Sequence, residues 1–148
     1  ISKSYGVPGV RLGVLCTSNT NLINHIKKDV SIWNINSFGE FYLQIYEKYK
    51  KDYAVALKNI KHARKIFIDK LKDVKEFRVI PSEANYVTIE VLEGTSKELC
   101  ISMLEKNIFI KDLTPKINWL NKQFIRVAIR DEVDNDLFVK AIKSYYKA

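Results

Sequence analysis

Apolar residues recur every three or four positions through the middle of the chain, which is the pattern of an amphipathic helix. Ser37-Phe38-Gly39-Glu40 matches the S-x-x-E capping box and stands immediately before this pattern, so we expect a helix to begin there. A charged stretch at 48–52 interrupts the pattern. The periodicity predicts one long helix, or two joined rods, with apolar positions at Phe41, Ile45, Tyr49, Tyr53, Ala56, Leu57, Ile60, Ala63, Phe67 and Leu71.

The remainder of the chain alternates strand and helix patterns. Residues 76–80, 84–92, 108–110 and 124–129 are rich in valine, isoleucine and aromatic residues and are predicted to be strands. A second capping box, Thr95-Ser96-Lys97-Glu98, predicts a helix that ends at Asn107, and a last helix is expected from about Val133. This order predicts an α+β layer in which helices cover a sheet.

The N-terminal part is harder to assign. Residues 10–16 are mostly apolar with loose alternation, which favours a strand buried on both faces. The polar run 17–21 is expected to cap a short helix with Leu22, Ile23 and Ile26 on one side. Residues 30–36 fit either a strand or an irregular connection.

Composition limits the class of protein. The chain has 148 residues, of which 47% are hydrophobic, enough to bury one core. It has no apolar run long enough to span a membrane and no apolar signal segment at its start, so we expect an unsecreted, cytoplasmic protein. Cys16 and Cys100 cannot build a disulfide framework and are interpreted as small buried residues in a reducing compartment.

The net charge is +8, and only five of the 25 basic residues are arginines. Ten basic residues fall within 48–75, mostly on what is predicted to be the solvated side of the long helix. Nucleic-acid surfaces favour arginine and exposed aromatic residues, so no nucleic-acid partner is expected. No membrane partner is expected either, because no apolar run is long enough to span a membrane. A non-enzymatic basic module that binds an acidic partner is kept as the alternative from another functional class.

Candidate chemistry gathers at the start of the chain, where Lys3, a glycine-containing loop and Arg11 come in quick succession. A lysine amine can bond covalently to an aldehyde cofactor. The planar guanidinium of Arg11 suits a phosphate, and Gly6 and Gly9 allow close approach of the backbone. Together these residues indicate a site for a phosphate-bearing aldehyde.

The segment Lys3-Ser4-Tyr5-Gly6-Val7-Pro8-Gly9-Val10-Arg11-Leu12-Gly13 resembles the pyridoxal-phosphate attachment signature of class I/II aminotransferases, which have fold type I. Trp33-Asn34-Ile35-Asn36 and Pro81-Ser82-Glu83-Ala84-Asn85-Tyr86 are similar to segments of histidinol-phosphate aminotransferases and threonine-phosphate decarboxylases. The resemblance implies that Lys3 carries pyridoxal 5'-phosphate as the catalytic residue and that Arg11 helps to bind it.

The same resemblance extends to the substrate. Phe124-Ile125-Arg126-Val127-Ala128-Ile129-Arg130 is similar to the strand whose first arginine receives the substrate carboxylate, which implies that role for Arg126. A bidentate arginine suits this task because it fixes the geometry at Cα. Lys111 stands where relatives often carry an arginine that contacts a distal phosphate. Arg130 is expected to be structural or paired with an aspartate of the run 131–136.

The resemblance implies an α/β enzyme of which this chain is the C-terminal portion: residues 1–47 end the large cofactor-binding domain, and residues 48–148 form the small α+β domain. Transfer of an amino group between an amino acid, or an amino-phosphate compound, and a 2-oxo acid is the first expectation. A threonine-phosphate-type decarboxylase is the enzymatic alternative. Relatives also imply a homodimer and, in some pathways, a fused upstream nucleotidyltransferase domain. We expect the chain to be inactive alone, and neither His25 nor His62 predicts a metal site.

Overall fold

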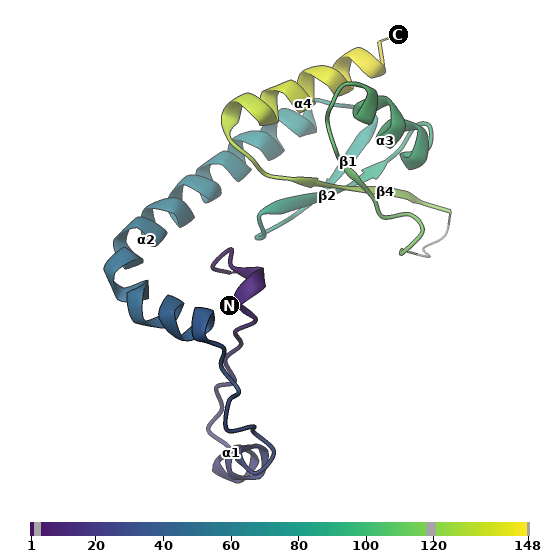
Figure 1. Cartoon of the computed structure of the whole chain (residues 1–148). Coiled ribbons are helices and arrows are strands. Elements are labelled where there is room, and N and C mark those ends of the chain that lie inside the picture. Colours follow the sequence, from purple (N-terminus) through teal and green to yellow (C-terminus); the bar gives the residue numbers. More distant parts are fainter. Residues whose placement is uncertain (2–3, 118–120, 148) are drawn as a thin grey trace. The chain divides into compact units, whose positions relative to one another are not determined.

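The computed structural model of the chain describes residues 1, 4–117 and 121–147 (Figure 1). It divides into two compact units, Ile1–Val55 and Ala56–Ala148, which are described separately below. One helix of 36 residues, α2 (Ser37–Lys72), contributes to both units. The long helix expected from the apolar periodicity is therefore a single helix.

The first unit contains the 3-10 turn η1 (Pro8–Val10), the helix α1 (Thr20–Lys27) and the beginning of α2. The predicted short helix is confirmed as α1, and the Asn19 side chain caps it by accepting a hydrogen bond from the Leu22 amide. At the start of α2, the Asn36 carboxamide oxygen accepts from the Gly39 amide at 2.9 Å. The cap is thus Asn36, one residue earlier than the predicted Ser37.

The prediction of a buried strand at 10–16 is wrong. Within the described part of this unit no strand is present, so residues 11–16 have no neighbouring strand to pair with. All of them except Leu12 are exposed, including Cys16, for which burial was expected. Apolar composition alone predicted the strand, but a strand also needs a pairing partner for its backbone.

Leu12 instead packs against the start of α2. A Cβ atom built on Gly39 would lie only 3.0 Å from Cδ2 of Leu12, so only glycine fits this position without a shift of the Leu12 side chain. The Asn36 side-chain Nδ2 atom also donates to the Val10 carbonyl oxygen at 2.9 Å. These contacts attach the stretch that follows the glycine-containing loop to the helix.

The second unit is built on a four-stranded antiparallel sheet with the order β1-β2-β4-β3. Its strands are β1 (Phe77–Ile80), β2 (Tyr86–Val91), β3 (Lys111–Asp112) and β4 (Gln123–Ala128). The strands predicted at 76–80, 84–92 and 124–129 are confirmed. The one predicted at 108–110 is wrong, because the short strand that pairs with β4 begins at Lys111.

Three helices cover one face of this sheet: the C-terminal half of α2, α3 (Ser96–Glu105) and α4 (Glu132–Tyr145) (Figure 1). Alternate residues of the central strands point into this layer, so the core combines sheet and helix side chains. Its most buried members include Phe67, Leu71, Val87, Ile89, Leu99, Met103, Ile125 and Ile142. The predicted α+β layer is confirmed.

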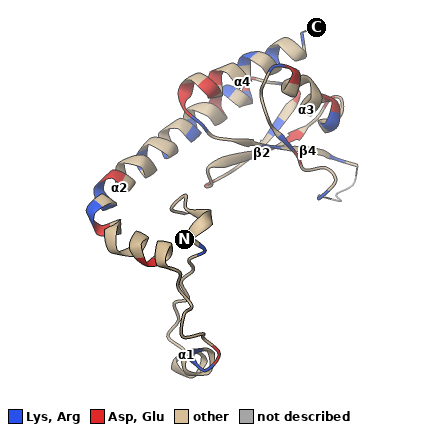
Figure 2. Cartoon of the chain, viewed as in Figure 1, with Lys and Arg blue, Asp and Glu red and all other residues tan. Residues whose placement is uncertain are grey.

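The helix ends follow the expected chemistry. The Thr95 hydroxyl accepts from the Glu98 amide, as the second capping box predicted, and Asn107 ends the turn after α3 with a φ of 59°. In α4, acidic residues gather at the N-terminus and Lys143 lies in the last turn, an arrangement that the helix dipole favours (Figure 2).

Candidate functional site

The lysine loop, defined here as residues 3–9, begins at Lys3, which lies outside the described residues. The backbone immediately after it is held by α2. The Tyr53 hydroxyl donates to the Ser4 carbonyl oxygen at 2.8 Å. The Tyr5 ring stacks on the Tyr53 ring with centroids 4.7 Å apart and meets the Tyr46 ring edge-on at 5.3 Å. Tyrosines of the long helix thus fix the chain next to the candidate cofactor lysine.

The phenols of Tyr46 and Tyr53 remain protonated near neutral pH. Hydrogen bonding with Tyr5, assisted by burial, raises the pKa of Tyr46 to about 12, and burial raises the pKa of Tyr53 above its usual value. They therefore place no negative charge beside the lysine loop. The Tyr5 ring itself packs against the rings of Tyr46 and Tyr53.

Arg11 follows the turn η1 with a φ of 52°, an uncommon conformation for a residue other than glycine. Its guanidinium is exposed and donates one long hydrogen bond, of 3.4 Å, to the Pro8 carbonyl oxygen. Among the described residues no carboxylate pairs with it. The fork of donors is thus available for an anion.

The glycines of the loop leave room for such an anion. Gly6 has a φ of +68°, and a Cβ atom built at Gly6 or Gly9 would meet nothing within 4 Å. An available guanidinium and an open backbone form a donor set that suits a phosphate group. The described residues of the loop therefore fit pyridoxal 5'-phosphate.

In the second unit, the register of the sheet brings the two predicted substrate-binding cations together. Lys111 of β3 lies directly opposite Arg126 of β4, and both side chains are exposed. No carboxylate pairs with either one in the part of the chain that the structure describes. Like charges directly opposite each other destabilise a sheet, so an anion between them would be favoured.

Arg126 has one further neighbour, an aromatic ring. Its Cζ atom lies over the ring of Tyr86, 5.2 Å from the centroid, and Thr88 stands opposite it on β2. Arg126 therefore has neighbours on both adjacent strands: the Tyr86 ring and Thr88 on β2, and Lys111 on β3.

Other cations near the sheet are already neutralised. Glu90 accepts from Arg78 and pairs with Lys122 at 3.3 Å. Burial opposes ionisation of Glu90, but the hydrogen bonds from these two cations outweigh it and lower its pKa. Arg130 pairs with Asp134 at the start of α4, which confirms the expected aspartate partner. Arg78, Lys122 and Arg130 thus have carboxylate partners, whereas Lys111 and Arg126 have none in the described structure.

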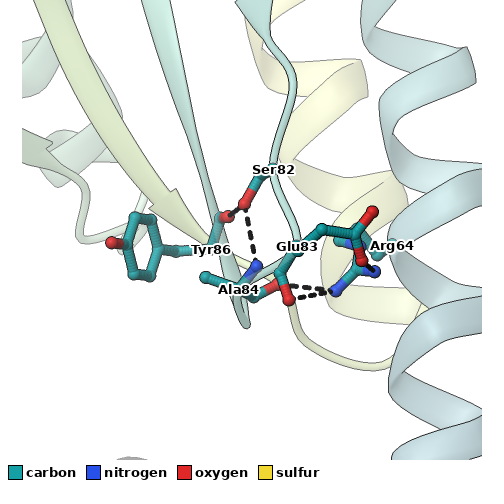
Figure 3. A network of polar contacts seen from close by, with 5 residues as sticks. All are labelled: Arg64, Ser82, Glu83, Ala84 and Tyr86. Atoms are coloured by element: carbon teal, nitrogen blue, oxygen red, sulfur yellow. Dashed lines mark hydrogen bonds and ion pairs between the residues drawn. The ribbon is translucent and has the colours of Figure 1, made fainter.

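Sequence reasoning missed Arg64, a buried residue of α2. Its Nη1 atom donates to the carbonyl oxygens of Glu83 at 2.7 Å and Ala84 at 3.1 Å, and Nη2 pairs with the Glu83 carboxylate (Figure 3). Arg64 thereby holds the turn that connects β1 to β2, and Tyr86 is the first residue of β2 after this turn. The sequence pattern places most of the basic residues of 48–75 on the solvated side of the helix and does not single out Arg64. Only its place between Ile60 and Phe67 in the apolar stripe could have signalled burial.

Several residues of the basic run 48–75 are also paired. Lys50 pairs with Glu47, Lys72 with Asp69, and Lys70 with both Glu132 and Asp136. These ion pairs reduce the positive charge that the run can offer to an acidic partner. No helix in the described part of the chain is long and apolar enough to cross a membrane.

Comparison with known proteins identifies the family of this chain. Residues 1–142 match the family aminotransferase class I and II. L-serine phosphate decarboxylase from Campylobacter jejuni is 31% identical over 99% of this chain and 38% of its own length. CMP-5'-(3-aminopropyl)phosphonate synthase from Streptomyces rubellomurinus is 28% identical over 96% of the chain and 23% of its own length.

Among solved structures, the histidinol-phosphate aminotransferase from Clostridium acetobutylicum superposes with a TM-score of 0.86 at 31% identity. The match covers 97% of this chain and 43% of that one, and it lies in the C-terminal region of a fold-type-I enzyme. The chain thus spans less than half the length of these relatives. They include fused multidomain proteins.

Proposed function

We propose an activity that starts from the family of this chain, which belongs to aminotransferase class I and II. The intact protein transfers amino groups between an amino acid, or an amino-phosphate compound, and a 2-oxo acid. Members of this family use pyridoxal phosphate, and the homologues are divided between aminotransferases and phosphate-ester decarboxylases. In this proposal residues 1–47 complete the large cofactor-binding domain and residues 48–148 form the small domain.

Each candidate residue has a defined task in this proposal. Lys3 binds the cofactor covalently through its amine and, once released, moves a proton to and from the substrate Cα. Arg11 holds the phosphate through its guanidinium fork. Arg126 binds the substrate carboxylate and so fixes which bond at Cα can break. The bound cofactor supplies an electron sink for the charge that develops at Cα.

The observation that carries the proposal is the pair of cations in register on β3 and β4, Lys111 and Arg126, without carboxylate partners among the described residues. One carboxylate satisfies one arginine, so a second cation directly opposite favours a substrate with a second anionic group. We infer that Lys111 contacts a phosphate or another distal anion of the substrate. Lysine would bind it as a point charge, with less geometric selectivity than an arginine in the same place.

The enzymatic alternative is a decarboxylase that acts on a phosphorylated amino acid. The relative named L-serine phosphate decarboxylase favours it, and the same two cations would serve it equally well. The two reactions differ only in which bond at Cα is broken, the bond to hydrogen or the bond to the carboxylate. Arg126 would bind the carboxylate in both.

A panel of substrates separates the two activities. The intact protein, loaded with pyridoxal phosphate, is incubated with O-phospho-L-serine or L-glutamate in the presence of 2-oxo acids, and the products are identified by mass spectrometry. An aminotransferase yields a new amino acid and a new 2-oxo acid, whereas a decarboxylase yields carbon dioxide and O-phosphoethanolamine. Lys3→Ala should abolish either reaction. Turnover that survives Lys3→Ala would refute the proposal.

A homodimer is the proposed assembly of the intact protein. Light scattering at two protein concentrations tests it, and a monomer at both would contradict it. The basic-module alternative predicts instead that salt-sensitive binding to nucleic acid or anionic lipid survives Lys3→Ala.

A further inference from the structure

We propose that Tyr86 is a positioning residue that holds the Arg126 guanidinium ready for the substrate carboxylate, and that Arg64 maintains Tyr86 in place. The inference rests on the proposed function, because it requires that Arg126 bind a carboxylate. It assigns a specific task to a ring and to a buried cation that the reaction itself does not use.

The register of the sheet brings the ring to the guanidinium. Arg126 lies opposite Thr88, and Tyr86 lies opposite Ala128, so Tyr86 and Arg126 are diagonal neighbours on the same face of the sheet. Long side chains reach each other across such a diagonal. The Cζ atom of Arg126 accordingly lies over the Tyr86 ring, 5.2 Å from its centroid.

The backbone at Tyr86 is fixed from two directions. The Ser82 hydroxyl donates to the Tyr86 carbonyl oxygen at 2.6 Å and accepts from the Ala84 amide at 3.1 Å. Arg64 donates to the two carbonyl oxygens of the same turn, and Figure 3 shows this network leading from α2 to the backbone carbonyl oxygen of Tyr86. The first residue of β2 therefore starts from a rigid turn.

A ring beneath Arg126 restricts its side chain without consuming its donors. Arginine loses much rotamer freedom when it binds a ligand, and this loss weakens binding. A cation held over an aromatic face has lost part of that freedom before the ligand arrives, while its N–H groups remain available for a carboxylate. Lys111, opposite on β3, has no ring contact in the described structure, so the restriction applies to the carboxylate-binding cation alone.

The test measures binding of O-phospho-L-serine to the intact, cofactor-loaded protein by calorimetry, and KM and kcat in parallel. O-phosphoethanolamine, which lacks only the carboxylate, is the control ligand. We expect Tyr86→Leu to weaken phosphoserine binding about two- to five-fold, which is the range of an exposed cation–π contact. KM should rise by a similar factor with kcat nearly unchanged, and O-phosphoethanolamine should bind as before.

Matched variants separate positioning from folding. Tyr86→Phe keeps the ring and should retain wild-type binding. Tyr49→Leu removes another exposed ring that also lies under a cation, Lys48, and should have no effect. Arg64→Lys keeps the charge but loses the fork that holds the turn, and should reproduce part of the Tyr86→Leu defect.

A double-mutant cycle decides the matter. In an Arg126→Gln background, where there is no cation to hold, Tyr86→Leu should change phosphoserine binding by less than about 1.5-fold. Equal losses in both backgrounds, or equal losses for both ligands, would overturn the inference while leaving the proposed function standing. If phosphoserine fails to bind, or if Arg126→Gln leaves its affinity unchanged, the assigned role of Arg126 and the inference fall together.

Discussion

Replacement of Arg64 by methionine is expected to destabilise the second unit markedly. The guanidinium is buried and donates to the carbonyl oxygens of Glu83 and Ala84 at 2.7 and 3.1 Å. Hydrogen bonds from a charged group contribute about 1.5 to 3 kcal/mol each. Methionine fills most of the space but leaves both carbonyl oxygens without this donor.

The expected loss is smaller than the sum of those bonds. The Glu83 side chain is 91% exposed, so its ion pair with Arg64 contributes less than about 1 kcal/mol. Methionine also removes the cost of keeping a cation out of water. We therefore expect Arg64→Met to lower the free energy of unfolding by about 2 to 4 kcal/mol.

Urea unfolding of the intact protein measures this loss, and hydrogen exchange resolved by peptide locates it. Exchange should accelerate at the Ala84 and Ile129 amides, which donate to Ser82 and Asn85 around the same turn. Glu83→Gln is the matched control and should cost less than about 1 kcal/mol. If Arg64→Met costs no more than Glu83→Gln, the two carbonyl bonds do not hold the turn and the reasoning is wrong.

Three further predictions concern residues that support the candidate site. Glu90→Gln should lower the free energy of unfolding by about 1 to 3 kcal/mol at pH 7. Because the folded pKa of Glu90 is lowered, this stabilisation is present above its unfolded pKa of about 4.5 and is lost as the pH falls further, so urea midpoints of wild type and variant should converge there. Tyr53→Phe loses the hydrogen bond to the Ser4 carbonyl oxygen, which is expected to cost about 0.5 to 1.5 kcal/mol of local stability. Hydrogen exchange at the Tyr5 amide should therefore accelerate about two- to ten-fold. Unchanged exchange would show that Tyr53 does not hold the loop. Gly6→Ala should slow cofactor loading, because a residue with a Cβ atom is destabilised by about 1 kcal/mol or more at a φ of +68°. Gly9→Ala is the control and should load at the wild-type rate. Equal loading rates for the two variants would contradict the argument.

Much of the second unit could be predicted because its signals are local. The capping box at Thr95 specifies its helix through contacts three residues apart, and enrichment in valine, isoleucine and aromatic residues predicts β2 and β4. The pairing of Arg130 with Asp134 was similarly readable, since the two residues are only four positions apart. Such features need no knowledge of the tertiary fold.

The arrangement of the candidate site depends on distant parts of the chain and could not be predicted in this way. Lys111 meets Arg126 only because β4 lies between β2 and β3, and the sequence does not state that strand order. Tyr53 and Ser4 are separated by 49 positions. The strand expected at 10–16 failed for the same reason, because apolar composition does not reveal whether a pairing strand is nearby.

The central claim is that the Lys3 amine carries pyridoxal phosphate. The most direct measurement is to load the intact protein with the cofactor, reduce it with borohydride and identify the modified peptide by mass spectrometry. The account predicts a single cofactor adduct on Lys3, and a visible absorption band of the loaded protein that Lys3→Ala removes. An adduct on another lysine, or a band that persists in Lys3→Ala, would contradict it.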